Sequence, residues 1–308
     1  MIETILTNRP FEICYLPTIF ACMENLPYLK EEALQHLIDQ AILEDIGEGD
    51  HSSLASIPAE VQSKAQLIIK DEGILAGVAL AAMIFKKIDP ALTLETHITD
   101  GTAVKPGEIG FQVAGKVHSI LKAERLVLNC MQRMSGIATK THHLKQLISH
   151  TKARLLDTRK TTPNFRILEK WAVAIGGGKN HRFALYDMIM LKDNHIDFAG
   201  GITKAVKATH QYLANTGKKL EIEVETRTLA EVEEVLAVGG VQVIMLDNMS
   251  PALMKEAVTL IGDQAKTEAS GGITAETIKE VAETGVDYIS VGALTHSFKS
   301  LDMSLKAL

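Results

Sequence analysis

Cysteine is scarce in this sequence, and the few that occur exclude two kinds of site. The 308 residues contain three cysteines, Cys14, Cys22 and Cys130. An odd number, without the short paired spacings of metal ligands, favours neither a disulfide framework nor a zinc site. We therefore expect all three to be reduced residues of the fold.

The sequence also lacks a long hydrophobic run. Its most apolar stretch, residues 74–85, ends at a pair of lysines, whereas a membrane helix needs about 20 apolar residues. Apolar residues occur near the beginning of the chain, but charged residues interrupt them and no basic start precedes an apolar core. We expect a cytoplasmic protein without a membrane span.

An excess of positive charge is missing as well. The formal net charge is −6 at pH 7, and the chain contains 46% hydrophobic and 23% charged residues. Such a chain can bury a full core, and its length suits one large or two modest domains. Binding to nucleic acid in general needs a basic surface, so it is not expected, and any basic site must be local.

Patterns in the first half predict a small α/β unit. The apolar spacing along 30–45 and 77–87 predicts packed helices, and residues 102–117 predict turn-linked β structure. A long helical region starts near His118, and we expect Gly136 to interrupt it before a second helix begins.

The second half alternates short strand-like runs with helical segments. Four successive strand-like runs end on polar or small residues at intervals of 24, 23 and 22 residues: Glu223, Asp247, Ser270 and Gly292. One short strand plus one helix fills such an interval, which is the rhythm of a β/α barrel. A doubly wound sheet alternates in the same way, but polar residues repeated at the carboxyl ends of strands favour the barrel.

Basic residues gather between Asp157 and Lys192, although the whole chain is acidic. Arginine can hold a carboxylate or phosphate through two parallel hydrogen bonds, and lysine acts as a movable point charge. This mixture therefore predicts a site for a polyanionic substrate. A solvated surface is the simpler interpretation of three members, Arg166, Lys170 and Lys179. The other members are the candidate anion ligands: Arg159, Lys160, His181, Arg182 and Lys192.

Two loops with glycine follow successive strand-like runs, Ser270-Gly271-Gly272 and Gly292-Ala293. Small residues let backbone N–H groups approach phosphate oxygens, and a following helix adds its positive end. The pair therefore predicts a phosphate cradle, although tight turns alone would also explain it. A third set, Gly176–Gly178, precedes His181 and Arg182. We interpret that triplet as flexible backbone that re-aims these donors, because a helix cap explains only one glycine.

Two carboxylates at the ends of neighbouring strands, Glu223 and Asp247, suit ribose hydroxyls or a hard metal ion. Mg²⁺ prefers a few carboxylates together with substrate phosphate oxygens. Because Glu221 and Glu225 point to the same side of their strand as Glu223, the pattern alone leaves open which glutamate faces the site.

Ordered blocks along nearly the whole chain after residue 26 resemble quinolinate phosphoribosyltransferase. These blocks include the candidate residues above, and they are residues 44–50, 124–125, 128–129, 132–139, 157–163, 176–182, 192–195, 223–225, 246–248, 268–272 and 292–297. The resemblance implies an α/β protein with an N-terminal α/β sandwich-like domain and a C-terminal incomplete β/α (TIM-like) barrel. We expect an extension at 1–26, the first domain at 27–134, the barrel at 135–298 and a tail at 299–308.

The resemblance also implies a homodimer or higher homo-oligomer with shared active sites, and it supplies roles. Arg125 reaches the substrate carboxylates in the neighbouring subunit. Thr158, Arg159, His181 and Arg182 bind quinolinate, while Lys160 and Lys192 serve both this dicarboxylate and the pyrophosphate. Glu223 and Asp247 manage ribose and Mg²⁺. The 5′-phosphate of the co-substrate, phosphoribosyl pyrophosphate, goes to the two loops: Ser270, Gly271, Gly272, Gly292 and Ala293.

Two residues depart from the pattern of this family, in which glycine is common at both places. They are Asn164, after Pro163, and Ala184, shortly after the Asn-His-Arg block. Asparagine tolerates left-handed backbone angles and alanine adds only a methyl group, so neither change removes a chemical group.

The implied reaction makes nicotinate mononucleotide, pyrophosphate and CO₂ for NAD biosynthesis, with transfer before decarboxylation. Departing pyrophosphate leaves positive charge on ribose, so the site needs Mg²⁺ and lysines at the leaving group and carboxylates near the sugar. Three alternatives stay open: a related paralogue acting on another base or in molybdenum metabolism, a Schiff-base lyase using Lys160 or Lys192, and a non-catalytic binding barrel.

Overall fold

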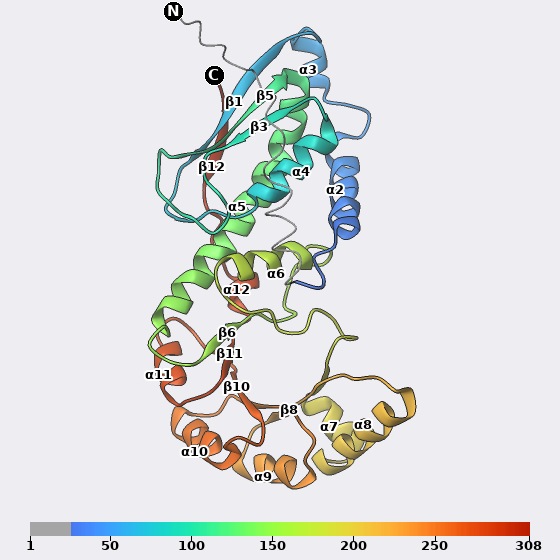
Figure 1. The fold of residues 1–308 in the computed structure, drawn as a ribbon, viewed down its shortest axis with the longest axis vertical. Coiled ribbons are helices and arrows are strands. Elements are labelled where there is room, and N and C mark those ends of the chain that lie inside the picture. The colour runs from blue at the N-terminus through green and yellow to red at the C-terminus, as the bar shows by residue number, and fades with distance from the viewer. Residues whose placement is uncertain (1–25) are drawn as a thin grey trace, which may run out of the picture.

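The computed structural model describes residues 26–308, and the extension with Cys14 and Cys22 lies almost entirely outside them. The two larger sheets lie at the two ends of one long helix, α5 (Figure 1), and β2 and β4 form a small third sheet. The helices are α2 (Glu31–Ile46), α3 (His51–Ser56), α4 (Val78–Ile88), α5 (Val117–Leu147), α6 (Arg166–Ile175), α7 (Asp193–Ala199), α8 (Ile202–Thr216), α9 (Leu229–Val238), α10 (Pro251–Ile261), α11 (Ile278–Glu283) and α12 (Ala293–His296).

The strands alternate with these helices along most of the chain. They are β1 (Gln62–Ile69), β2 (Gly73–Ile74), β3 (Thr93–Thr96), β4 (Ala103–Val104), β5 (Ile109–Lys116), β6 (Arg154–Leu156), β7 (Ile189–Leu191), β8 (Ile222–Thr226), β9 (Val243–Asp247), β10 (Lys266–Ser270), β11 (Tyr288–Ser290) and β12 (Met303–Ala307).

The first sheet is antiparallel, with strand order β12-β1-β5-β3. Along β1, buried and partly exposed residues alternate, and Leu67 and Ile69 are fully buried. That alternation is typical of a sheet with one face on a core. Helices α4 and α5 pack together beside this sheet (Figure 1). The predicted α/β unit is therefore confirmed, with an antiparallel sheet.

The second sheet has six parallel strands in the order β6-β11-β10-β9-β8-β7. From β7 to β11 each strand pairs with the next along the chain, so the order has no reversal of the kind that defines a doubly wound sheet. The sheet curls around (Figure 1), with β6 paired to β11 at one edge and β7 paired to β8 at the other. These two edge strands do not pair with each other. The expected incomplete barrel is confirmed.

Helix α5 corrects one expectation, because it runs unbroken through Gly136. A Cβ atom at Gly136 would lie 2.2 Å from the carbonyl oxygen of Lys299. The glycine therefore marks a close approach of the returning chain to the helix, not an interruption. Cys130 is buried on the same helix, and burial raises the pKa of its thiol to about 12.

Residues 299–308, expected as a tail, contain β12, which pairs with β1 from Ala65 to Ile69. The end of the chain thus completes the first sheet after the barrel has formed. Within residues 26–308, no helix combines the length and apolar character needed to cross a membrane.

Candidate active site

The carboxyl ends of the barrel strands carry several predicted site residues. Lys160 follows β6, Lys192 follows β7 and Asp247 ends β9. Parallel strands end at one rim, and Lys192 Nζ lies 3.8 Å from Glu225 Oε2 of β8 there. The hydroxyl of Thr295 donates to the carbonyl of Lys160 at 2.8 Å, which ties the β6 loop to α12. The fold therefore gathers cations and carboxylates from separate strands at one rim.

Arg159 lies close enough to Arg182 to lower its pKa, and neither arginine forms an ion pair within residues 26–308. The Nε of Arg159 is buried and has no hydrogen-bond partner among the described residues. Arg182 donates from Nη1 to the carbonyl of Met188 at 3.2 Å. Burial, followed by the positive charge of Arg159, lowers the pKa of Arg182. Two guanidinium groups with an unused buried donor are costly unless an anion neutralises them, so this pair favours a ligand with several carboxylate or phosphate oxygens.

A buried ion pair fixes the backbone next to Arg182. Lys170 Nζ contacts Asp157 Oδ1, and both side chains are fully buried. The same carboxylate oxygen accepts the N–H of His181 at 2.8 Å, and Lys170 donates to the carbonyl of His181 at 3.0 Å. Asn180 Nδ2 donates to Asp157 Oδ2 at 2.6 Å. Both backbone groups of His181 are therefore held by one ion pair.

This network shows that the surface interpretation of Lys170 was wrong, because a helix of the barrel domain, α6, buries it against Asp157. Arg166 is half-buried rather than solvated, and it donates to Thr161 and to the carbonyl of Phe183. Lys179 is exposed as expected, with its ammonium 5.3 Å from the centre of the Tyr288 ring.

His181 lies between two buried carboxylates inside the barrel. Its Nε2 is 2.9 Å from Glu223 Oε2 and 3.5 Å from Glu268 Oε2. Burial alone would lower the pKa of His181, but these carboxylates raise it to about 10. The N–H of Arg182 opposes them, because it donates to Nδ1 at 2.7 Å and so favours a ring with its proton on Nε2. In either form, Nε2 donates toward Glu223.

The same trio is a cluster within residues 26–308 whose ligand atoms, all within 4.8 Å of one another, could hold a metal ion. One ligand is a ring nitrogen, which Mg²⁺ rarely accepts. Burial, followed by the charge of Glu268, raises the pKa of Glu223, although the hydrogen bond from His181 acts in the opposite direction. The carboxylates engage Nε2 of His181 but leave Glu223 Oε1 and Glu268 Oε1 buried without a hydrogen-bond partner in the described residues. Because the third ligand is a ring nitrogen, the trio is a poor Mg²⁺ site.

The sheet register separates Glu223 from Asp247. Glu223 pairs with Val243, four residues before Asp247, and a strand rises about 3.3 Å per residue. Glu223 therefore lies about 13 Å deeper in the barrel by that rise. Glu225 pairs with Met245, and burial followed by the charge of Asp247 raises the pKa of Glu225. The glutamate that shares the rim with Asp247 is Glu225.

Both glycine loops lie at the rim, and backbone angles or close contacts explain why they contain glycine. Gly271 and Gly272 have φ of +97° and +60°, and a Cβ on Gly271 would lie 2.3 Å from Asn248 Oδ1. At Gly292 a Cβ would lie 2.9 Å from Lys160 Cδ. These contacts keep the loops small where substrate could approach them.

Close packing, and not the predicted flexibility, explains the glycine triplet Gly176–Gly178. A Cβ at Gly176 would lie 2.5 Å from the carbonyl of Ala138, and one at Gly178 would lie 2.8 Å from Thr141. The triplet therefore lets the end of α6 pack closely on α5. Asn164, by contrast, has φ of +61°, so the left-handed angle expected to be tolerated there is present.

Two predicted ligands lie apart from the centre of this cluster. Thr158 accepts the N–H of Lys160 with its hydroxyl at 3.1 Å, and so shapes the turn after β6. Arg125 is exposed on α5 in the first domain. No ion pair or hydrogen bond from the Arg125 side chain occurs within the described part of the chain.

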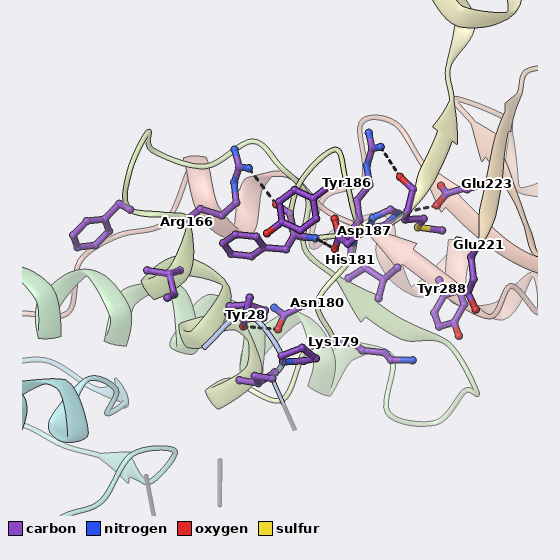
Figure 2. Close-up of a pocket in the computed structure, with 18 of the residues that line it drawn as sticks. Tyr28, Arg166, Lys179, Asn180, His181, Tyr186, Asp187, Glu221, Glu223 and Tyr288 are labelled. Atoms are coloured by element: carbon purple, nitrogen blue, oxygen red, sulfur yellow. Dashed lines mark hydrogen bonds and ion pairs between the residues drawn. The ribbon is translucent and has the colours of Figure 1, made fainter. Parts of the chain in front are cut away.

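A cavity of about 2200 Å³ reaches this cluster from the side away from the rim. Its lining includes His181, Arg182 and Glu223, but it does not include Lys160 or Lys192 at the rim. Figure 2 shows His181 directed toward Glu223, and Tyr28 joined to Asn180 by a hydrogen bond. The cavity therefore borders residues 179–183 on the side away from the rim, and Lys160 and Lys192 lie outside it.

The sequence interpretation missed several residues of this site. Glu268 lies two residues before Ser270 in β10, so strand alternation places both on one side, and that signal was readable. Asp157 follows β6 directly. For Tyr28 the sequence carries no comparable signal, because its partner Asn180 is 152 residues away.

Comparison with known families gives two adjoining matches. The model "Quinolinate phosphoribosyl transferase, N-terminal domain" matches residues 50–135, and "Quinolinate phosphoribosyl transferase, C-terminal domain" matches residues 137–306. Their junction lies within α5, which links the two sheets.

Curated proteins match along most of the chain. "Quinolinate phosphoribosyltransferase [decarboxylating] 1b" of Nicotiana tabacum is 49% identical over 288 residues, covering 89% of this chain and 82% of the relative. "Probable nicotinate-nucleotide pyrophosphorylase [carboxylating]" of Bacillus subtilis is 44% identical over 272 residues, covering 88% and 92%.

A solved structure shares the whole architecture. NadC from Streptococcus pyogenes superposes with a TM-score of 0.85 at 39% identity, covering 91% of this chain and 99% of that one. Sequence and structure thus agree over both domains, and the chain belongs to the quinolinate phosphoribosyltransferase family.

Proposed function

We propose that Arg159, His181 and Arg182 hold the two carboxylates of quinolinate in the activity that the chain shares with its family. That activity transfers phosphoribosyl from phosphoribosyl pyrophosphate to quinolinate with decarboxylation, giving nicotinate mononucleotide, pyrophosphate and CO₂ in NAD biosynthesis. The observation that carries the binding proposal is the close Arg159–Arg182 pair with a buried, unpaired Nε. A planar dicarboxylate supplies the missing acceptors.

The rim residues then stabilise charge as it develops. Lys160 and Lys192 stand where the pyrophosphate leaves, and their ammonium groups offset its growing negative charge. Glu225 and Asp247 face the ribose, whose anomeric carbon becomes positive. After the new bond forms, the pyridine nitrogen is cationic and stabilises the carbanion left by CO₂, so transfer comes first. Uptake of a proton from water by this carbanion then gives nicotinate mononucleotide. No general base or covalent nucleophile is needed.

Mg²⁺ is the metal that we propose for this reaction, with Asp247 and Glu225 as its protein ligands. The donor set fits, because both groups are carboxylates at the rim and the charge of Asp247 is close enough to raise the pKa of Glu225. When bound, the ion supplies positive charge to the pyrophosphate. Glu223, which we predicted as the second ligand, is engaged by His181 deeper in the barrel, so we assign it to positioning.

The 5′-phosphate belongs, in this proposal, to the loops Ser270–Gly272 and Gly292–Ala293. Positive φ angles at Gly271 and Gly272, and the close contact at Gly292, favour residues without large side chains, so backbone N–H groups stay accessible. A Schiff-base reaction has less support, because Lys160 and Lys192 are exposed, and an amine of that type is normally activated in an apolar pocket.

Arg125 supports a homodimer with shared sites, since it projects from the first domain without a partner in the described residues. The cytoplasmic location stays a prediction. Plant relatives carry the words "chloroplastic" and "mitochondrial" in their names.

A direct assay tests the binding proposal. The enzyme is incubated with quinolinate, phosphoribosyl pyrophosphate and Mg²⁺, and CO₂ and nicotinate mononucleotide are measured, with nicotinate as the competing substrate. Loss of one carboxylate leaves buried cations unpaired at a cost of several kcal/mol, so nicotinate should be used at least about a hundredfold less well. Arg159→Ala should remove most activity, while Arg154→Ala, at the exposed opposite end of β6, should not. Comparable turnover of nicotinate would contradict the dicarboxylate site.

A further inference from the structure

Tyr28 lies far from the substrate-binding residues in sequence but contacts the segment that contains them. It belongs to a tight turn before α2, in which Leu29 donates to the carbonyl of Leu26 at 2.8 Å. Leu29 is buried in the core, so the turn is anchored. Figure 2 shows Tyr28 beside Asn180 at the edge of the cavity. A residue at the very start of the first domain therefore reaches the barrel.

Tyr28 touches this segment on both sides of His181 and Arg182. Its hydroxyl donates to Asn180 Oδ1 at 2.7 Å. Its ring stacks on Phe183, with centroids 4.8 Å apart and planes 13° apart. Burial, followed by the negative charge of Asp157, raises the pKa of the hydroxyl, so Tyr28 is a neutral donor at physiological pH.

The hydrogen bonds of Asn180 fix the direction of this contact. Its Nδ2 donates to Asp157 Oδ2 at 2.6 Å and to the carbonyl of Lys170 at 2.8 Å. Because both N–H groups are used, the orientation of the Asn180 amide is fixed. Its oxygen, Oδ1, is the atom that faces Tyr28, and it accepts the hydrogen bond from the Tyr28 hydroxyl. Tyr28 therefore completes the network that holds the backbone of His181.

We propose that Tyr28 is a positioning residue for quinolinate binding, because it clamps residues 180 and 183 on either side of His181 and Arg182. It touches no substrate in this proposal and acts through Asn180 and Phe183. The proposal rests on the quinolinate-binding role given above to His181 and Arg182.

Tyr28→Phe keeps the stacked ring and removes the hydroxyl, so the variant should fold. The KM for quinolinate should rise about fivefold, the loss expected for one neutral hydrogen bond, with little change in the KM for phosphoribosyl pyrophosphate. Tyr28→Leu removes the stacking as well and should raise the quinolinate KM further. Tyr212→Phe, an exposed tyrosine on α8, is the matched control and should change neither constant.

Hydrogen exchange provides a readout that needs no turnover. In Tyr28→Phe the backbone amides of residues 181–183 should exchange about fivefold faster, while those of α8 stay unchanged. Unchanged exchange in both Tyr28 variants would overturn the clamp. Faster exchange with equal changes in both KM values would overturn its link to quinolinate. If the wild-type enzyme did not use quinolinate, the proposed function would fail, and the exchange result would still judge the clamp.

Discussion

At the scale of single residues, burial separates side chains that look alike in the sequence. Lys160, Lys170 and Lys192 all lie in the basic segment, but Lys170 is fully buried against Asp157 while the other two are exposed at the rim. A buried ammonium needs a paired carboxylate, and removing one partner strands the other charge. Lys170 therefore stabilises the backbone around His181, whereas the exposed lysines are accessible to a ligand.

The two glutamates of β8, Glu223 and Glu225, together with Asp247 of β9 give the first prediction. Glu225→Gln and Asp247→Asn should each raise the Mg²⁺ concentration for half-maximal activity on the order of tenfold, since each weakens the rim site. Glu223→Gln should lower activity without that shift, because its carboxylate bonds to His181. Activity measured across a Mg²⁺ titration separates these outcomes.

Melting temperatures of all three variants serve as the control for folding. A shifted Mg²⁺ requirement in Glu223→Gln, with none in Glu225→Gln, would restore Glu223 as the metal ligand.

At the scale of elements, the contacts between helices and strands determine where each element lies. Helix α5 packs against both domains, and the chain returning to β12 crosses it at Gly136. Strand β11 enters the barrel just after Asp287, whose carboxylate accepts the N–H and the hydroxyl of Thr267 on β10, each at 3.0 Å. Such contacts set the position of an element more tightly than its own propensity does.

Gly136→Ala tests the crossing on α5. In an isolated helix this change would stabilise by about 1 kcal/mol, but here the new methyl group would overlap the carbonyl of Lys299. We expect a loss of about 1 to 3 kcal/mol in the free energy of unfolding, as for overpacked cores. Urea denaturation measures it, and a variant as stable as the wild type would show that the crossing can relax.

Asp287 gives a prediction for the dependence of stability on pH. Burial raises the pKa of Asp287, but bonds from Thr267 and the ammonium of Lys152 lower it below its usual value. A lowered pKa in the folded state stabilises at pH above about 3.8, and this contribution disappears as pH falls through the folded value. Asp287→Asn should therefore cost about 2 kcal/mol near pH 7.

The difference in free energy of unfolding between the wild type and Asp287→Asn should stay constant from pH 7 to pH 5. It should become smaller below pH of about 3.8. Urea denaturation at several pH values measures this difference. A difference that grew toward low pH would mean that the carboxylate is not the stabilising form.

At the scale of the whole molecule, the two domains contribute different candidate site residues. The barrel carries the anion and rim residues, whereas Arg125 stands on the first domain and bonds to nothing in the described residues of its own chain. In a twofold dimer each first domain can meet the partner's barrel, because the same contact is made twice. The active unit would then be the pair of subunits.

Mixing of two inactive variants tests this arrangement. Arg125→Ala and Lys160→Ala homodimers should both be nearly inactive. In a freely exchanging equal mixture about half the dimers are mixed, and each has one intact site, so roughly a quarter of wild-type activity should return. If Arg125 served its own barrel, every site would keep one defect and mixing would restore nothing.

Native mass spectrometry must first confirm the mixed dimers, since failure to exchange would also leave the mixture inactive. No rescue with mixed dimers present would reject the shared site and leave the substrate assignment intact.

The sequence by itself determined the barrel and the strand-end position of the rim loops, and it supplied the candidate anion ligands. Strand and helix periods are local properties, and polar residues at the ends of parallel strands must share one edge. That is why Arg159, Lys160, Lys192 and Asp247 were found at the correct end of their strands.

The tertiary structure alone decided how deep each side chain lies and what it touches. Register placed Glu225 at the rim and Glu223 deeper in the barrel, and packing buried Lys170. Close approach of distant segments explained Gly136, and the contact between residues 28 and 180 had no local signal. Periodicity fixes the side of a strand on which a residue points, but contacts between distant segments arise only when the chain has packed.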